Sequence, residues 1–361
     1  MDSSENIKTN NRIIWADLLR IASIFSVVFL HTASAQWDVL NIASLDWQIA
    51  NFYKCLSRWG VPIFIMISGM FFLNPKKNIP LKHLYSVNIL RLALSYFFWT
   101  ALYFFTIYLL SNQPLNIKKA LEIFHLILKG ETSFHLWFVP MLIGLYIVTP
   151  ILRVFVSQAK NSDYTYFFIT SFIFASLIPL ILQIAPFAIY EKLILNLKLN
   201  LVIGYTSLFV LGIYLKETQI DAYLAKKIYL YGLLSSILTV LLTVFYSQQL
   251  HKQSELFLEY LTPNIICISI AVFVYFRNKF QTAEFTQKQI ETINILSKTS
   301  YGVYLVHIFF LYIFIQYGFF ATFGGIWLFI AIPILSVFIY IFSFMLSFLL
   351  SKIPGINKYL I

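Results

Sequence analysis

The apolar stretch WADLLRIASIFSVVFLH near the start of the chain carries two residues that could do chemistry, Arg20 and His31. On an α-helix, their spacing brings the two side chains to within about 20° of each other, about 16.5 Å apart along the axis. Asp17 lies three residues before Arg20 and can pair with its guanidinium on the same face. The structural alternative is that Arg20 extends to one membrane interface while His31 anchors the helix at the other. A shared face instead favours general-base catalysis, in which His31 takes a proton from an acceptor hydroxyl that attacks an activated acyl group.

A second apolar segment, SRWGVPIFIMISGMFF, places Arg58 too deep for its side chain to reach the membrane surface easily. Such a residue is expected to face a polar cavity, at a depth close to that of His31. Pro62 predicts a kink in this helix, and Gly69 predicts a close approach of a neighbouring helix. Ser68 either faces the cavity or bonds to its own helix. A purely structural buried arginine is the alternative for Arg58.

Two later segments add aromatic and titratable side chains. In FHLWFVPMLIGLYIVTP, His135 and Trp137 lie at the outer end of a predicted helix, where aromatic belts normally form, so they are either anchors or site residues. In SKTSYGVYLVHIFF, Tyr301, Tyr304 and His307 follow one another at intervals of three residues and form a loose stripe on one helix. A hydrogen-bonded core histidine is the alternative for His307.

The elements that must position these residues are long and apolar. The 361 residues are 60% hydrophobic and only 11% charged, well below the roughly 25% charged residues of soluble domains. The alternating pattern of a membrane β-barrel is absent. We predict an all-α, polytopic integral membrane protein with a single membrane-embedded domain over residues 1–361. About ten transmembrane helices are expected, near 12–35, 48–73, 84–110, 135–157, 164–185, 200–216, 226–247, 259–276, 299–320 and 324–350.

The distribution of basic residues predicts the orientation. Most lysines and arginines outside the spans fall in alternate connecting segments, which by the positive-inside rule places both termini, including the short tail 1–11, in the cytoplasm. The net charge of +11 therefore reflects membrane topology. Because the basic residues are not gathered on a soluble face, nucleic acid is not predicted as a partner.

Taken in order, these motifs resemble the acyltransferase-3 family of membrane acyltransferases. The resemblance covers essentially the whole chain and begins with an arginine, ten residues and a histidine in WADLLRIASIFSVVFLHT. It is strongest to stand-alone members similar to the O-acetyltransferase of enterobacterial common antigen. One departure is Ile21, because many members have a glycine after the arginine.

The resemblance implies a multi-pass protein of the bacterial inner membrane that takes an acetyl group from cytoplasmic acetyl-CoA. The group passes to a sugar hydroxyl of a cell-envelope or exported glycan, or of a lipid-linked saccharide. His31 matches the essential histidine of the family motif, and Arg20 and Arg58 match its arginines. The pantetheine arm of CoA is comparable in length to the about 16.5 Å between Arg20 and His31. The CoA phosphates could therefore meet Arg20 while the thioester reaches His31.

We thus predict His31 as general base and Arg58 as the second catalytic residue, with Arg58 or a tyrosine polarising the thioester carbonyl. Both direct transfer and an acyl-imidazole intermediate on His31 are compatible with these residues. Acetyl-CoA is a substrate, so no permanently bound cofactor is expected, and without metal-ligand spacing or a familiar metal motif no metal is expected either. The alternative function is a transporter or flippase for a lipid-linked glycan or small solute. The predicted substrate- and CoA-binding residues are Asp17, Arg20, Ser68, His135, Trp137, Tyr301, Tyr304 and His307.

Overall fold

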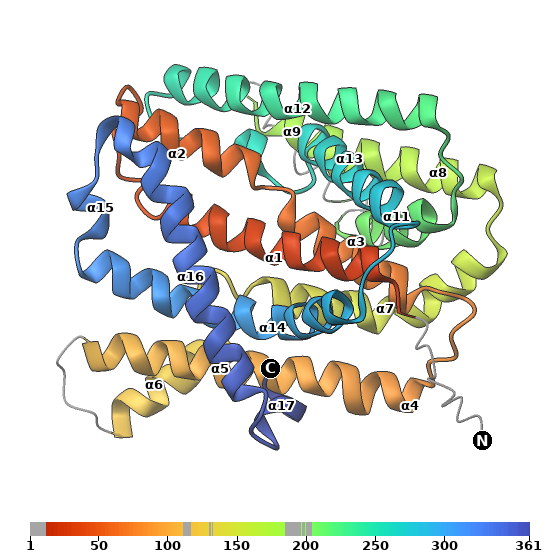
Figure 1. Ribbon diagram of the computed structural model, residues 1–361, viewed down its shortest axis with the longest axis horizontal. Coiled ribbons are helices and arrows are strands. Elements are labelled where there is room, and N and C mark those ends of the chain that lie inside the picture. The colour runs from red at the N-terminus through yellow and green to blue at the C-terminus, as the bar shows by residue number, and fades with distance from the viewer. Residues whose placement is uncertain are drawn as a thin grey trace.

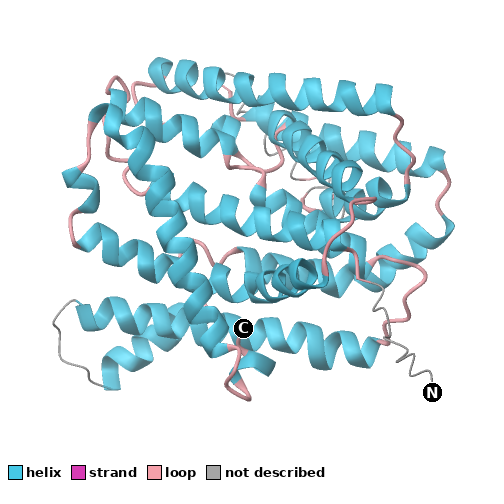
Figure 2. Ribbon diagram, in the orientation of Figure 1, coloured by secondary structure: helices cyan, strands magenta, loops and turns pink. Residues whose placement is uncertain are grey.

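The computed structural model describes residues 12–110, 117–129, 131, 133–184, 196, 199 and 204–361. In that part of the chain the regular elements are all helical and there is no strand (Figure 2). The elements, labelled where there is room in Figure 1, are α1 (Ile14–Ser34), α2 (Leu45–Leu56), α3 (Gly60–Phe72), α4 (Leu81–His83), η1 (Leu84–Ile89), α5 (Leu90–Leu110), α6 (Ile117–Leu128), α7 (Phe138–Gln158), α8 (Asn161–Ser171), η2 (Phe172–Leu177), α9 (Ile178–Leu182), α11 (Thr206–Glu217), α12 (Ala222–Gln249), η4 (Leu256–Leu258), α13 (Pro263–Phe280), α14 (Gln287–Gln316), α15 (Phe319–Thr322), η5 (Gly325–Trp327), α16 (Leu328–Leu350) and α17 (Ile356–Tyr359).

Nine helical segments in the described residues are long and apolar enough to cross a membrane. They correspond to nine of the ten predicted spans, which confirms the polytopic helical fold. The predicted span 200–216 corresponds to α11, which has only 12 residues, and residues 200–203 lie outside the described part. In α12 only 17% of the most apolar window is buried inside the protein. Its leucines therefore face outward in a continuous apolar surface, as contact with lipid requires.

Helix α1 lies at the centre of the molecule and packs against α2, α3, α13, α14 and α16 (Figure 1). Asp17 in its first turn suits the positive end of the helix dipole. A Cβ atom at Gly60 of α3 would lie only 2.8 Å from the Ser23 carbonyl oxygen, so α1 and α3 approach closely. Neighbours on several sides thus fix the position of the helix that carries both Arg20 and His31.

The second span is broken, but at a different place from the predicted kink. The break covers residues 57–59, between α2 and α3, whereas Pro62 lies in the first turn of α3. A proline there interrupts no hydrogen bond, because the first N–H groups of a helix have no partner within it. The Ser57 carbonyl oxygen accepts a hydrogen bond of 2.7 Å from the Ser26 hydroxyl of α1, besides one of 3.5 Å from the Gly60 amide. Arg58 therefore extends from a break in the helix rather than from a regular helix face.

The predicted close approach at Gly69 is confirmed by the crossing of α3 and α11. A Cβ atom at Gly69 would lie 1.7 Å from the Phe209 carbonyl oxygen, and one at Gly212 would lie 1.8 Å from the Met66 carbonyl oxygen. The two backbones are thus in direct contact at two glycines, as in small-residue crossings of membrane helices. This crossing fixes the face of α3 that carries Ser68.

Two predicted helix starts are wrong in ways that matter for the site. Helix α14 begins at Gln287 rather than near 299, because Thr286 caps it by accepting a hydrogen bond from the Gln289 amide. Helix α7 begins at Phe138, so His135 and Trp137 lie in the turn before it rather than on the helix.

Candidate active site

Three histidines from distant parts of the sequence meet beside the end of α1. The rings of His31 of α1 and His307 of α14 are nearly parallel, with centroids 5.0 Å apart, and the centroid of His135 lies 5.3 Å from that of His307. The Nδ1 atom of His31 and the Nε2 atom of His307 are 2.7 Å apart, at hydrogen-bonding distance. His135 and His307 are 2% and 0% exposed, which excludes the interface-anchoring alternative for His135. The structure thus brings together three residues that the sequence placed in separate motifs.

His31 opens into a cavity of about 570 Å³, which we call the His31 cavity. Arg58 lines the same cavity, as the sequence predicted, together with Lys54. Three carboxylates and several aromatic rings complete most of the wall. The lining residues used below are Asp38, Glu255, Glu259, Trp137, Tyr205, Tyr260 and Tyr312.

Arg58 is held by contacts on three sides. Its Nε donates to the Leu258 carbonyl oxygen at 2.6 Å, and its Nη2 lies 3.1 Å from Glu255 Oε2. The guanidinium carbon lies 4.7 Å from the ring centroid of Tyr260, a cation–π contact. Lys54, only 2% exposed, donates to the other oxygen of Glu255. Burial alone would raise the pKa of Glu255, but Arg58 and Lys54 outweigh it and hold the pKa below the ordinary range of a glutamate.

The aromatic wall of the cavity is a stack of rings. Trp137 lies 5.6 Å from Tyr260 with nearly parallel planes, and 5.8 Å from Tyr205. Trp137, Tyr205 and Tyr260 all line the His31 cavity. A flat aromatic surface beside carboxylates suits a ligand with both apolar C–H faces and hydroxyl groups.

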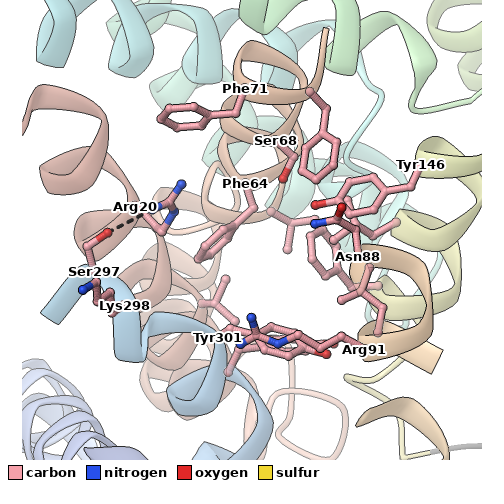
Figure 3. A pocket seen from close by; sticks show the side chains of 17 residues that line it. Arg20, Phe64, Ser68, Phe71, Asn88, Arg91, Tyr146, Ser297, Lys298 and Tyr301 are labelled. Carbon is pink, nitrogen blue, oxygen red and sulfur yellow. Dashed lines mark hydrogen bonds between the residues drawn. The ribbon is translucent and has the colours of Figure 1, made fainter. Parts of the chain in front are cut away.

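Arg20 lines a second cavity, of about 370 Å³, shown in Figure 3 and called the Arg20 cavity. The predicted pair with Asp17 is confirmed, with Nη1 of Arg20 3.2 Å from Asp17 Oδ1. The same Nη1 donates to the Ser297 hydroxyl at 3.0 Å, and that hydroxyl donates to Asp17 at 2.6 Å. Asp17 is 4% exposed, so it holds Arg20 in position and does not face the cavity.

The Arg20 cavity is positively charged. Arg91 and Lys298 line it together with Arg20, and no carboxylate is among the described residues that line it. The buried Asn88 Oδ1 and Arg91 Nε atoms have no hydrogen-bond partner in the described part of the chain. The cations and the unpaired Arg91 Nε–H donor suit an anionic ligand, whereas the Asn88 oxygen needs a hydrogen-bond donor on the ligand.

Three other predicted residues, Ser68, Tyr301 and Tyr304, line the Arg20 cavity. Ser68 bonds to the hydroxyl of Tyr146, another lining residue, and Tyr301 donates to the Ser95 hydroxyl at 2.9 Å. Figure 3 shows Ser68, Tyr146 and Tyr301 around the same space, although they come from α3, α7 and α14.

Comparison with protein-family models matches an acyltransferase domain, of the acyltransferase-3 type, over residues 13–352. The chain belongs to this acyltransferase family. No curated protein and no solved structure matches it. The matched residues of the acyltransferase include all the helices that line the two cavities.

The two cavities of the acyltransferase are separate and share no lining residue. Phe138 and Tyr304 close the Arg20 cavity on the side of the histidines, with ring centroids 5.7 Å apart. The Tyr304 hydroxyl donates to the His135 carbonyl oxygen at 2.5 Å, which holds its ring in place. The interruption is nevertheless short, because Val27 lines the Arg20 cavity one helical turn before His31.

Only some of the residues that the sequence analysis missed carry a signal by which they could have been found. Arg91 and Lys54 could have been selected as candidates, because charged residues inside predicted spans are uncommon. Glu255 and Ser297 carry no comparable signal, because they lie near the ends of apolar segments, where polar residues are ordinary. In the described residues no group of three histidine, cysteine or acidic side chains could hold a metal ion.

Proposed function

We propose that this acyltransferase moves an acetyl group from acetyl-CoA, bound in the Arg20 cavity, to a sugar hydroxyl held in the His31 cavity. The observation that carries the proposal is the place of His31. The His31 side chain lines the His31 cavity, and Val27, one helical turn earlier on α1, lines the Arg20 cavity. With both termini in the cytoplasm of a bacterial cell, the Arg20 cavity faces the source of acetyl-CoA. The His31 cavity then faces the outer side of the inner membrane.

The charge of the Arg20 cavity supports an anionic donor. CoA carries phosphate groups, which arginine binds through charge-assisted hydrogen bonds. Arg20, Arg91 and Lys298 supply three cations around the cavity. Arg20 and His31 are about 16.5 Å apart along the helix axis, a distance that the pantetheine arm can span from the phosphates to the imidazole. For the thioester to pass, the side chains of Phe138 and Tyr304 must rotate away from their present positions.

The composition of the His31 cavity supports a carbohydrate acceptor. Trp137 and Tyr260 offer a flat surface for the C–H face of a sugar ring, and the carboxylates of Asp38 and Glu259 can accept hydrogen bonds from hydroxyls. The resemblance to stand-alone members favours a cell-envelope or exported glycan, such as the repeat unit of enterobacterial common antigen or of a lipopolysaccharide.

In the proposed reaction His31 takes the proton of the acceptor hydroxyl as the oxygen attacks the thioester carbonyl. The C–S bond then breaks, and the CoA thiolate leaves with the proton that His31 carried. The guanidinium of Arg58 lies in the same cavity, with N–H groups beyond those bonded to Leu258, Glu255 and Tyr260. We assign it to the oxyanion of the tetrahedral intermediate.

The test is incubation of membranes with acetyl-CoA labelled in the acetyl group, in a glycan-producing background. Label should appear in glycan with the wild-type chain and with His125→Ala, since His125 is an exposed histidine of α6 that lines neither cavity. Label should be lost with His31→Ala. A transporter or flippase would instead move glycan or solute with no labelling of glycan in any background. Transfer by His31→Ala at close to the wild-type rate contradicts the proposed mechanism.

A further inference from the structure

The ring nitrogens of His307 have different and fixed partners. Its Nδ1 atom lies 2.7 Å from the Tyr304 carbonyl oxygen. A carbonyl oxygen only accepts hydrogen bonds, so Nδ1 of His307 carries the hydrogen. In a neutral imidazole the other nitrogen then has a lone pair and no hydrogen, which makes Nε2 of His307 an acceptor.

This assignment determines the hydrogen on His31. The Nε2 acceptor of His307 lies 2.7 Å from Nδ1 of His31, so Nδ1 of His31 must be the donor. The neutral His31 ring therefore carries its hydrogen on Nδ1 and its lone pair on Nε2. Within the described residues no hydrogen bond occupies that Nε2 atom, and His31 lines the cavity assigned to the acceptor.

The other charged and titratable groups around the pair agree with a neutral His307. His307 is fully buried, and the rings in contact with it are His31, His135 and Tyr304. Arg58 and Lys54, from the broken second span, are the cations close enough to act on His31. The carboxylates of Asp38, Glu255 and Glu259 and the hydroxyl of Tyr312 line the cavity without a hydrogen bond to either histidine in the described part of the chain. A positive charge on the fully buried His307 ring, which has no carboxylate partner, is strongly unfavourable.

We propose that His307 is a positioning residue that sets the tautomer of His31, so that Nε2 of His31 is the atom that accepts the proton. This rests on the proposed function of His31 as base and replaces the predicted role of His307 in substrate binding. When His31 is protonated in the reaction, its Nδ1–H still donates to His307, so the hydrogen bond is kept through the proton transfer. The Tyr304 carbonyl thus orients His307 in the way that a carboxylate orients the base in a catalytic triad.

The test is nuclear magnetic resonance of the full chain, labelled with ¹³C and ¹⁵N in histidine, in lipid bilayers at a pH where its imidazoles are neutral. The signals of His31 are those lost in His31→Asn. In the wild-type chain Nδ1 of His31 should show the ¹⁵N shift of a protonated nitrogen, and Nε2 that of an unprotonated one. In His307→Leu a population with the hydrogen on Nε2 should appear. His307→Gln offers an amide oxygen near the position of Nε2 and should restore the wild-type pattern.

Activity gives a second readout. His307→Leu should lower kcat for acetyl transfer by about 10²–10⁴-fold, as loss of a general base or of its correct tautomer does. KM for acetyl-CoA should stay within about threefold of wild type, because His307 does not line the Arg20 cavity. His307→Gln should recover at least tenfold in kcat. A purely structural role would change KM and kcat together and would give no rescue by glutamine.

The outcomes separate this proposal from the proposed function. A wild-type spectrum with the hydrogen on Nε2 of His31 overturns the tautomer assignment, even if His307→Leu fails to fold. An unchanged His31 tautomer in folded His307→Leu overturns the positioning role while leaving His31 as base. If instead the Nδ1–H tautomer depends on His307 but His31→Ala still transfers acetyl, the role of His31 as base fails and the tautomer assignment stands.

Discussion

The crossing of α3 and α11 leaves no space for a methyl group at Gly69. An added Cβ atom would lie 1.7 Å from the Phe209 carbonyl oxygen and 2.5 Å from its carbonyl carbon. Carbon and oxygen atoms in contact are usually separated by about 3.3 Å or more, so α11 would have to move by about 1.6 Å. Since the atoms met are backbone atoms, rotation of a side chain cannot relieve the contact.

The free energy of this change follows from two opposing effects. Overpacking of a tight interior costs up to about 3 kcal/mol, and a backbone contact belongs at the upper end of that range. Replacing glycine by alanine within a helix gains about 1 kcal/mol. We therefore expect Gly69→Ala to lower the free energy of unfolding by about 2 kcal/mol. Because Ser68 lies on the same helix, α3, and lines the Arg20 cavity, it should be displaced too, and KM for acetyl-CoA should rise.

The matched control is Gly144→Ala in α7, where an added Cβ atom would have nothing within 4 Å. This variant makes the same chemical change and should leave the melting temperature unchanged or slightly raised. The measurement is thermal unfolding of detergent-solubilised protein, followed by tryptophan fluorescence, with gel filtration to check that each variant is folded. A melting temperature of Gly69→Ala equal to that of Gly144→Ala would refute the backbone contact.

Three further predictions concern the cavities. His31→Ala should lower kcat for acetyl transfer by about 10²–10⁴-fold with little change in melting temperature, as measured with labelled acetyl-CoA. Arg20→Gln should raise KM for acetyl-CoA by about 10–100-fold, since a hydrogen bond to a charged group contributes about 1.5–3 kcal/mol, and a KM within twofold of wild type would contradict the donor site. Glu255→Gln should remove an acid-sensitive part of the stability. Burial raises the pKa of Glu255, but pairing with Arg58 and Lys54 outweighs burial and keeps this pKa below its ordinary range. The stability that the pairing contributes is therefore present above about pH 4.3 and is lost as the pH falls further. The difference in melting temperature between wild type and Glu255→Gln should therefore shrink between pH 6 and about pH 3.

The helical spans could be predicted from the sequence because a membrane imposes a simple condition on them. An apolar run of about 20 residues suffices for one crossing, and this condition is local. The break at residues 57–59 depends instead on contacts with distant residues, such as the hydrogen bond from Ser26 to the Ser57 carbonyl. Pro62 suggested a break for a local reason but lies where a helix tolerates proline.

The same distinction applies to the site. The pair of Asp17 and Arg20 lies within one helical turn, so spacing alone predicted it. His31 and His307 could each be selected as polar residues in apolar segments, but their hydrogen bond joins positions 276 residues apart. Sequence spacing contains no information on such a pair, because it arises when α1 packs against α14. The sequence therefore predicted separate roles for His31 and His307, as base and as substrate-binding residue, and not the hydrogen bond that joins them.

A single rigid helix explains how two cavities of opposite character can serve one reaction. The Arg20 cavity has cations and no carboxylate among its described lining residues, whereas the His31 cavity has carboxylates around its two cations. An anionic donor is therefore favoured in the first cavity and a neutral, hydroxyl-rich acceptor in the second. Helix α1 crosses both, and its geometry fixes the distance and the angle between Arg20 and His31. One residue added between them would rotate His31 by about 100°, away from His307 and out of the cavity. The interval of ten residues between arginine and histidine is thus required by the geometry of the proposed transfer.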